Sequence, residues 1–319
     1  MRRILALFLV VAALVGVGFY SLRGRGYRRI IAKMIYDSGP GPCVIEPGRS
    51  FEIDYFGARY VGDSSTVIDR EILCHGAWER SMLYFLRDAA RSLERDDLVF
   101  LDIGANTGTH SIFMAQHVRT VHAFDPYAPV LARMEKSLVA GNVTNVVVHA
   151  VGLGEDAAML PYEEPEEQNM GTGSFVAGLT TANTDRGIVL KIVNGDEYVR
   201  QAGIEHAELI KIDTEGFEKP VLKGLRGLLE SSRPIVAMEL TLNADIEQLF
   251  SSREDLLAVF PGDYDLFVIL GKSNDTGRYL LKDLPLEFGV RGTNVQHDIV
   301  VMPRELAGRV PTEYSGDRK

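Results

Sequence analysis

The sequence predicts an α/β fold with a mainly parallel, Rossmann-like sheet and helices on both of its faces. Short apolar runs alternate with segments of helical periodicity through residues 98–270, which is typical of parallel strands joined by helices. A glycine-rich turn between a strand and a helix, within residues 98–116, marks the ligand-binding edge of such a sheet. The last two predicted strands have no clear helix between them, so we expect an antiparallel last strand.

The amino-terminal part of the chain contains a long apolar segment. Residues 4–22 are 19 residues without a charge, close to the length that crosses a bilayer. We predict a membrane anchor, with a cleaved secretory signal as the alternative. The denser basic residues after the segment predict a cytoplasmic folded part that also contacts anionic lipid. Two basic residues, Arg2 and Arg3, precede the segment, and five follow it: Arg23, Arg25, Arg28, Arg29 and Lys33. The expected localisation is therefore that of a single-pass membrane protein.

Net charge separates residues 1–36 from the rest of the chain. Residues 1–36 hold seven of the 34 basic residues and none of the 44 acidic ones. The remaining 27 basic and 44 acidic residues give residues 37–319 a formal charge of −17, which repels phosphate backbones and disfavours a nucleic-acid partner. Cys43 and Cys74 lie outside any C-x-x-C pattern, and we expect both to be reduced, as in a cytosolic domain.

The expected domains follow shifts in composition along the chain. Residues 1–36 are the expected anchor with its basic segment. Residues 37–76 are a linker followed by a small β-hairpin, because residues 51–61 alternate apolar and polar side chains. Residues 77–306 form the main domain, which begins with a helix, and residues 307–319 form a polar tail.

Strands and helices alternate through the main domain. The expected strands are 98–103, 120–125, 143–151, 188–193, 208–213, 234–240, 265–270 and 298–302. The expected helices are 77–93, 109–116, 128–140, 196–202, 219–229 and 246–259. The connection over residues 155–208 is longer than an ordinary loop. We expect either a loop that shapes a substrate site or a mobile surface loop.

The glycine turn and two acidic residues predict a nucleoside site. Asp102, Gly104 and Gly108 form the pattern D-x-G-x-x-x-G. Asn106 stands where a dinucleotide fingerprint requires glycine, and no lysine of a phosphate-binding loop follows. The remaining pattern is that of turns that bind S-adenosylmethionine (SAM). Asp125 ends the next apolar run about 20 residues on, where an acid holds ribose hydroxyls. The alternative is that both acids only cap loops.

An ordered set of motifs resembles the FkbM family of SAM-dependent methyltransferases. The resemblance covers residues 76–303, and it implies a class I methyltransferase sheet, SAM as cofactor and O-methylation of hydroxyls on sugars, glycolipids or polyketides. One departure is Asp125, where the family usually has glutamate. The matching segments are D-x-G-A-N-x-G at 102–108, F-D-P at 124–126, N-x-G-x-x-S at 169–174, I-K-x-D-x-E-G-x-E at 210–218, V-L-x-G at 221–224 and R-P with a later glutamate at 233–239.

The candidates for catalysis are acids that end two neighbouring strands. Methyl transfer requires alignment of the acceptor and a group that accepts the proton of a hydroxyl. Asp213 is the first candidate for this base, Glu215 the second, and Glu239 would orient the acceptor. The alternative is that Asp213 and Glu215 cap the following helix. In the family, a segment equivalent to that of Glu79 lies beside the SAM pocket. We predict no metal site for this reading.

Two other functions remain open from the sequence. Asp213-x-Glu215 resembles a metal site of a membrane-anchored glycosyltransferase, with a nucleotide-sugar as donor, although this leaves the glycine turn unexplained. The chain could also be a non-catalytic adaptor of the same fold. For the methyltransferase reading we expect a saccharide, glycolipid or other small-molecule acceptor and no nucleic acid. The sequence predicts no oligomeric state.

Overall fold

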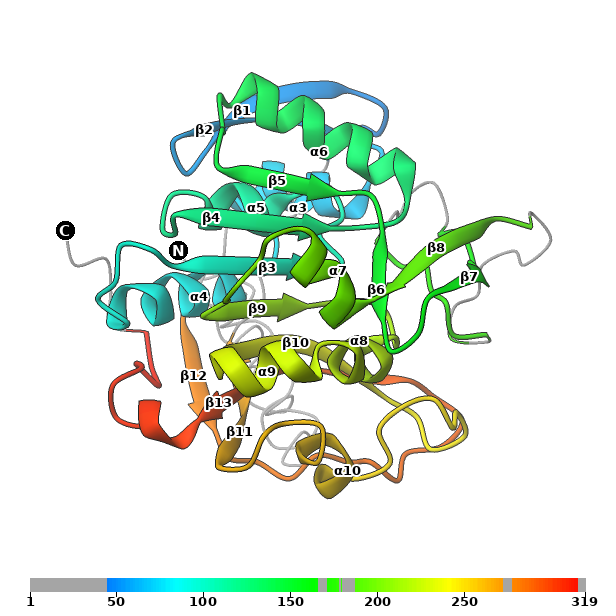
Figure 1. Ribbon diagram of the computed structural model, residues 1–319. Coiled ribbons are helices and arrows are strands. Elements are labelled where there is room, and N and C mark those ends of the chain that lie inside the picture. The colour runs from blue at the N-terminus through cyan, green and yellow to red at the C-terminus, as the bar shows by residue number, and fades with distance from the viewer. Residues whose placement is uncertain (1–44, 166–170, 178, 180–186, 272–276, 315–319) are drawn as a thin grey trace, which may run out of the picture. The chain divides into compact units, whose positions relative to one another are not determined.

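The central sheet has eight strands in the order β12-β11-β13-β10-β9-β3-β4-β5 (Figure 1). The computed structural model describes residues 45–165, 171–177, 179, 187–271 and 277–314. The strands of this sheet are β3 (Val99–Ile103), β4 (Thr120–Phe124), β5 (Val146–His149), β9 (Leu209–Ile212), β10 (Ile235–Leu242), β11 (Tyr264–Gly271), β12 (Tyr279–Lys282) and β13 (Val295–Pro303).

The strand directions confirm the predicted sheet. Strands β5, β4, β3, β9 and β10 pair in parallel, and β13 pairs antiparallel with both β10 and β11. Strand β12, which pairs antiparallel with β11, was not predicted. The carboxyl ends of β3, β4 and β9 therefore meet at one edge, where ligands of open α/β sheets bind.

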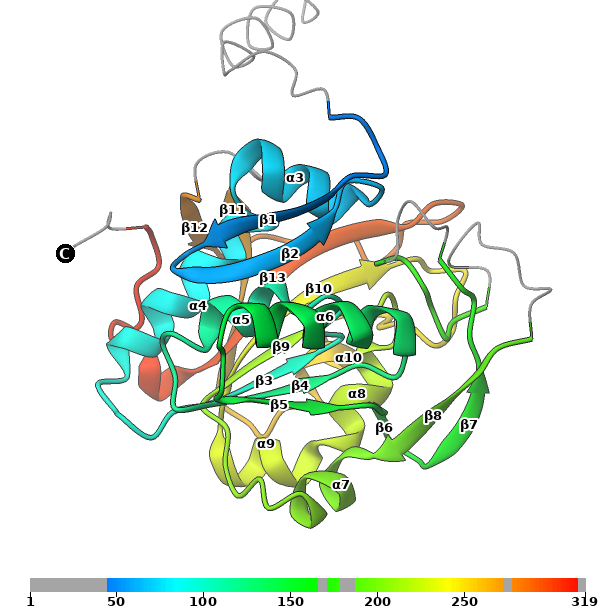
Figure 2. The ribbon, with the colours of Figure 1, turned by 90° about the horizontal axis from the view of Figure 1, so that it is seen from above.

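Helices cover both faces of the sheet (Figure 2). Helices α4 (Arg80–Ser92), α5 (Thr109–Met114) and α6 (Ala128–Ala140) pack on one face, and α7 (Gly195–Gln201), α8 (Glu218–Gly224), α9 (Arg226–Ser232) and α10 (Arg253–Leu257) on the other. Successive strand residues point to opposite faces. Phe100 and Leu209 accordingly join the first core, and Leu101 and Ile210 the second. This explains why the strands read as continuous apolar runs.

Two small sheets flank the central one. Strands β1 (Ser50–Tyr55) and β2 (Ala58–Asp63) form the predicted hairpin. Strands β6 (Gly152–Gly154), β8 (Val189–Asn194) and β7 (Ala158–Pro161) form a three-stranded sheet in that order. The chain ends its regular structure with a 3₁₀ turn, Arg304–Leu306.

Two expected helices are interrupted or shortened in the structure, and one observed helix was not predicted. The predicted helix 219–229 is interrupted, because Leu225 leaves helical geometry and separates α8 from α9. Of the predicted helix 246–259, only α10 is helical. Ser252 caps its start by accepting a hydrogen bond from the Asp255 amide. Helix α3 (Val67–His75) was not predicted, and Thr66 caps its start by accepting a hydrogen bond from the Asp69 amide.

The predicted localisation and cysteine state are corrected by the structure. Among the described residues, no helix combines the length and apolar character needed to cross a membrane. This finding contradicts the predicted single-pass membrane protein. The apolar segment 4–22, on whose length and lack of charge that prediction depended, lies outside the described residues. Cys74 is disulfide-bonded, so the prediction of a reduced thiol was wrong there, because cysteine spacing alone does not show which residues meet in the fold.

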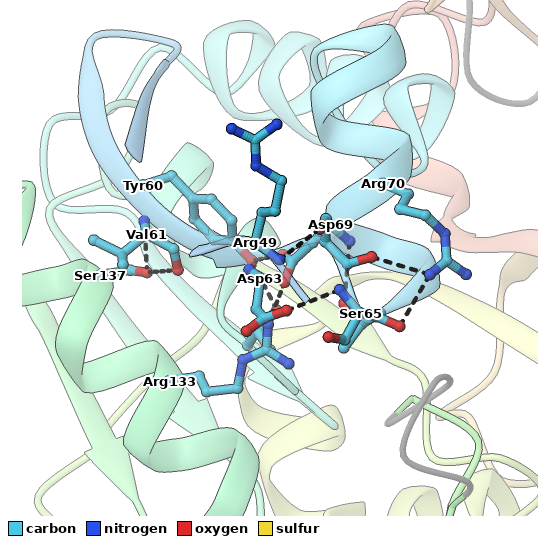
Figure 3. Close-up of polar contacts among 12 residues, drawn as sticks. Arg49, Tyr60, Val61, Asp63, Ser65, Asp69, Arg70, Arg133 and Ser137 are labelled. Atoms are coloured by element: carbon cyan, nitrogen blue, oxygen red, sulfur yellow. Dashed lines mark hydrogen bonds and ion pairs between the residues drawn. The ribbon is translucent and has the colours of Figure 1, made fainter. Parts of the chain in front are cut away.

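A buried acid connects the hairpin, α3 and α6 (Figure 3). Asp69 is fully buried and accepts hydrogen bonds from the Tyr60 hydroxyl at 2.7 Å and the Asp63 amide at 2.7 Å. It also forms an ion pair with Arg133 of α6. The Tyr60 oxygen in turn accepts from the Thr107 hydroxyl of the glycine turn at 3.3 Å. The hairpin is thus tied to the loop that begins α5.

We expect Asp69→Ala to lower the free energy of unfolding by about 3–5 kcal/mol, because the change removes the buried carboxylate that both Arg133 and the Tyr60 hydroxyl contact. Urea denaturation monitored by circular dichroism measures this. The matched control is Glu52→Gln, which removes an exposed ion pair with Arg59 and should change stability by less than about 1 kcal/mol. Equal losses in the two variants would show that the Asp69 network does not stabilise the fold.

Candidate active site

The glycine turn and Asp125 contact each other directly. The amides of Gly104 and Ala105 donate to the Phe124 carbonyl at 2.9 and 3.0 Å, which places the turn across the end of β4. The Asn106 amide donates to Asp125 Oδ2 at 3.0 Å, and the Tyr127 amide to Asp125 Oδ1 at 2.9 Å. Both carboxylate oxygens are therefore held in a fixed orientation, and each keeps a lone pair for a further donor.

A cavity lies between this turn and the ends of β4 and β9. It is open to solvent, and a concave site of this kind is where small molecules usually bind. Burial raises the pKa of Asp125 to about 6, although the two backbone amides oppose the shift. The cavity is lined by Gly104, Asn106, Asp125, Pro126, Tyr127, Val130, Tyr162, Gly171, Gly173, Phe175, Asp213, Thr214 and Glu215.

Two predicted cofactor residues lie outside the cavity lining. Asp102 is fully buried and accepts from the Ser111 hydroxyl at 2.6 Å, so it fixes the start of α5. Its other oxygen lies 3.7 Å from Lys211 Nζ. Gly108 faces α6, where an added Cβ would lie 2.5 Å from Met134 Cγ. Both residues shape the turn from behind, whereas Gly104, Asn106 and Asp125 face the cavity.

The long connection after β7 supplies aromatic walls that the sequence analysis missed. Tyr162 packs against Tyr127 and Phe175, with ring centroids 5.3 and 5.1 Å apart. Ser174 donates to the Glu215 carbonyl at 2.6 Å, which joins this segment to the end of β9. The described part of the connection is thus built into the cavity. Asn169, the first residue of the N-x-G-x-x-S segment, lies outside the described residues.

The predicted catalytic acids cluster at the same edge of the sheet. Asp213, Glu215 and Glu239 each offer one oxygen, and these oxygens lie within 4.8 Å of one another. Gln296 joins two of them, donating to Glu239 at 2.6 Å and Glu215 at 3.2 Å. Asp213 and Glu215 line the cavity, whereas Glu239 lies outside its lining.

The turn between β9 and α8 is held by another acid. Glu218 accepts from the amides of Gly216 at 2.9 Å and Thr214 at 3.3 Å. The sequence left open whether Asp213 and Glu215 cap the following helix, and no side chain caps α8 at its N-cap, Phe217. The carboxylates of Asp213 and Glu215 instead line the cavity and join the acid cluster.

A buried lysine balances part of the negative charge. Lys211 donates to the Gly104 carbonyl and to Asp213 Oδ2, each at 3.1 Å. Burial alone would lower the Lys211 pKa, but Asp213 and Asp102 raise it above its usual value. Burial and the neighbouring Asp213 raise the pKa of Glu215 to about 8 and that of Glu239 to about 10. The cluster therefore carries more acids than its single buried amine can pair.

Comparison with known proteins identifies the family. The model of the methyltransferase FkbM domain matches residues 102–268, slightly more than half of the chain. The chain belongs to the FkbM methyltransferase family. The matched region begins at Asp102 and includes the turn, Asp125 and all three predicted catalytic acids.

Two curated proteins are similar in sequence to this FkbM methyltransferase. The chain is 27% identical over 180 residues to hexuronic acid methyltransferase AglP of Haloferax volcanii. The alignment covers 56% of the chain and 69% of that protein. It is 25% identical over 148 residues to methyltransferase 1 of Beauveria bassiana. The second match covers 41% of the chain and 59% of the fungal protein.

Solved structures of methyltransferases also resemble this FkbM chain. The methyltransferase FkbM from Methylobacillus flagellatus KT matches with a TM-score of 0.38 and 18% identity, covering 65% of the chain and 44% of that protein. The SAM-dependent methyltransferase from Agrobacterium tumefaciens matches with a TM-score of 0.42 and 11% identity, covering 83% of the chain and 73% of that protein.

Proposed function

We propose that this FkbM methyltransferase uses SAM and methylates a hydroxyl group. The observation that carries the proposal is the contact between Asp125 and the Asn106 amide at the cavity wall. This contact places a carboxylate beside the turn, where it accepts hydrogen bonds from a ribose diol. Gly104 lets the turn lie against the Asp213 carbonyl at the cavity wall, and the acids of the cavity favour a cationic sulfonium over a nucleotide phosphate.

The proposed acceptor is a hydroxyl on a saccharide, a glycolipid or another secondary metabolite. The sulfonium leaves as a neutral thioether, so the reaction needs no strong acid, and a base must take the hydroxyl proton. Asp213 supports this role because it lines the cavity and pairs with Lys211. The similarity to a hexuronic acid methyltransferase supports a sugar-derived acceptor.

Ligand binding and methyl transfer test the proposal separately. In thermal shift assays, SAM or its product S-adenosylhomocysteine (SAH) should raise the melting temperature of the chain, whereas a UDP-sugar with Mn²⁺ should add nothing beyond Mn²⁺ alone. Incubation with methyl-labelled SAM and a membrane lipid and glycan extract should then yield a labelled product. Binding without any transfer would favour the adaptor alternative, and stabilisation by the UDP-sugar would favour the glycosyltransferase.

The affinity for SAH should fall below about pH 6. The ionised Asp125 carboxylate accepts the ribose hydroxyls, and its pKa is about 6, so the binding form is present above this pH and is lost as the pH drops through it. Well below the pKa, the dissociation constant should rise about tenfold per pH unit. Calorimetric titration from pH 5 to 8 measures this. Asp125→Asn should bind more weakly and lose the pH dependence, whereas an unchanged profile would exclude Asp125 as the ribose ligand.

A further inference from the structure

Three acids meet next to the cavity, on elements far apart in the sequence. Glu239 of β10 lies directly opposite Asp298 of β13 in the antiparallel register, and Glu79 immediately precedes α4. Each of the three offers one carboxylate oxygen, and these oxygens lie within 4.8 Å of one another. Two oxygens that bind one cation at about 2.1–2.4 Å are at most about 4.8 Å apart. The arrangement therefore suits a shared cation without backbone movement.

The charge of this trio, Glu79, Glu239 and Asp298, is not balanced by basic side chains. Among the residues that the structure describes, no lysine or arginine forms an ion pair with any of the three. The nearby Lys211 amine already contacts the Gly104 carbonyl and Asp213. When ionised together, three clustered carboxylates repel one another, and a bound divalent ion offsets that repulsion.

A buried histidine gives an independent indication of a missing partner. His110 is 3% exposed, and its Nε2 atom has no hydrogen-bond partner. This atom lies 3.6 Å from Glu79 Oε2, so it is directed at the trio. A water molecule bound to a cation would supply the partner that Nε2 lacks.

We propose that Glu79, Glu239 and Asp298 bind one divalent cation of the Mg²⁺ or Mn²⁺ class. An all-carboxylate donor set selects hard cations of this kind. The second acid group, Asp213 with Glu215 and Glu239, is a weaker candidate because Lys211 already pairs with Asp213. Glu239 belongs to both groups and places the cation beside the cavity. Resting on the proposed function, the cation would hold the acceptor hydroxyl near Asp213 and make its proton easier to remove.

Direct binding of Mn²⁺ to the full chain tests the site. Loss of the free Mn²⁺ signal in electron paramagnetic resonance should show one ion per chain, and Mg²⁺ should displace it. Glu239→Gln and Asp298→Asn should each weaken Mn²⁺ binding by at least about 10–100-fold. Loss of a group that only hydrogen-bonds a metal ligand already has an effect of this size. Glu230→Gln, an exposed change on α9, should leave the affinity unchanged. Asp213→Asn should retain binding within a few-fold.

SAH calorimetry on every variant separates this proposal from the proposed function. It also shows that each variant is folded. A wild-type chain that binds SAH but no Mn²⁺ would overturn the cation site and leave the proposed function intact. Unchanged Mn²⁺ affinity in both Glu239→Gln and Asp298→Asn would overturn it too, as would a loss confined to Asp213→Asn. Normal Mn²⁺ binding that depends on the trio, in a chain that never binds SAH, would support the cation site and count against the proposed function.

Discussion

Gly104→Ala should abolish measurable binding of SAH. The residue has φ +75°, and a Cβ built there would lie 1.8 Å from the carbonyl oxygen of Asp213. The left-handed backbone alone costs a non-glycine residue about 1–2 kcal/mol. The clash is far more severe, because two strands held by the sheet would have to separate at the cavity wall. We expect the dissociation constant for SAH, measured by calorimetry, to rise by at least about 100-fold, about 2.7 kcal/mol.

Gly203→Ala separates the clash from the backbone conformation. Gly203 has φ +71°, and a Cβ there would meet nothing within 4 Å. It should therefore lose stability by about the left-handed cost alone and bind SAH as the wild type does. A Gly104→Ala chain that melts cooperatively and binds SAH normally would contradict the geometry of the turn. Equal loss of SAH binding in both variants would show that strain, and not the close approach to Asp213, controls the site.

Local patterns were sufficient to predict the parallel core of the fold. Residues 100–103 and 209–212 are buried on both faces, so the apolar runs around them carried the signal without any knowledge of their neighbours. The helix 128–140 was predicted with its observed bounds, because Pro129 fixes its first turn and its apolar spacing is regular. The predictions failed where contacts outside the local pattern set the backbone conformation. Residues 246–252 are an example, because Ser251 and Ser252 form hydrogen bonds with Asp255 that begin α10 there.

The site was predicted as far as its residues lie in sequence motifs. Asp125 and Gly104 were found because both follow strands at a known spacing. Asp298 and Tyr162 were missed, since neither lies in a motif that the sequence analysis used. Asp298 joins the acids only through the antiparallel register of β13, which sets residue pairs across 59 positions of chain. Glu79 likewise joins the acid cluster only because α4 packs beside the sheet.

Asp213→Asn should lower the rate of methyl transfer by about 10²–10⁴-fold, the usual contribution of a general base. Asparagine keeps the shape and the hydrogen-bonding oxygen but accepts no proton from the acceptor hydroxyl. SAH affinity should change little, because the proposed ribose contact is made by Asp125 and not by Asp213. The measurement is single-turnover transfer from methyl-labelled SAM to a membrane lipid and glycan extract that supports the wild-type reaction, with SAH calorimetry on the same preparation.

The comparison of Asp213→Asn with Asp213→Glu distinguishes a base from a purely structural acid. If Asp213 serves only to pair with Lys211, Asp213→Asn should mainly lower stability, because a buried amine without its carboxylate is costly. In that case Asp213→Glu should preserve function poorly. If Asp213 is the base, Asp213→Asn should keep a cooperative melt and SAH binding while transfer collapses, and Asp213→Glu should recover part of the rate. Retention of wild-type transfer by Asp213→Asn would exclude the role and move the assignment to Glu215, the other acid that lines the cavity.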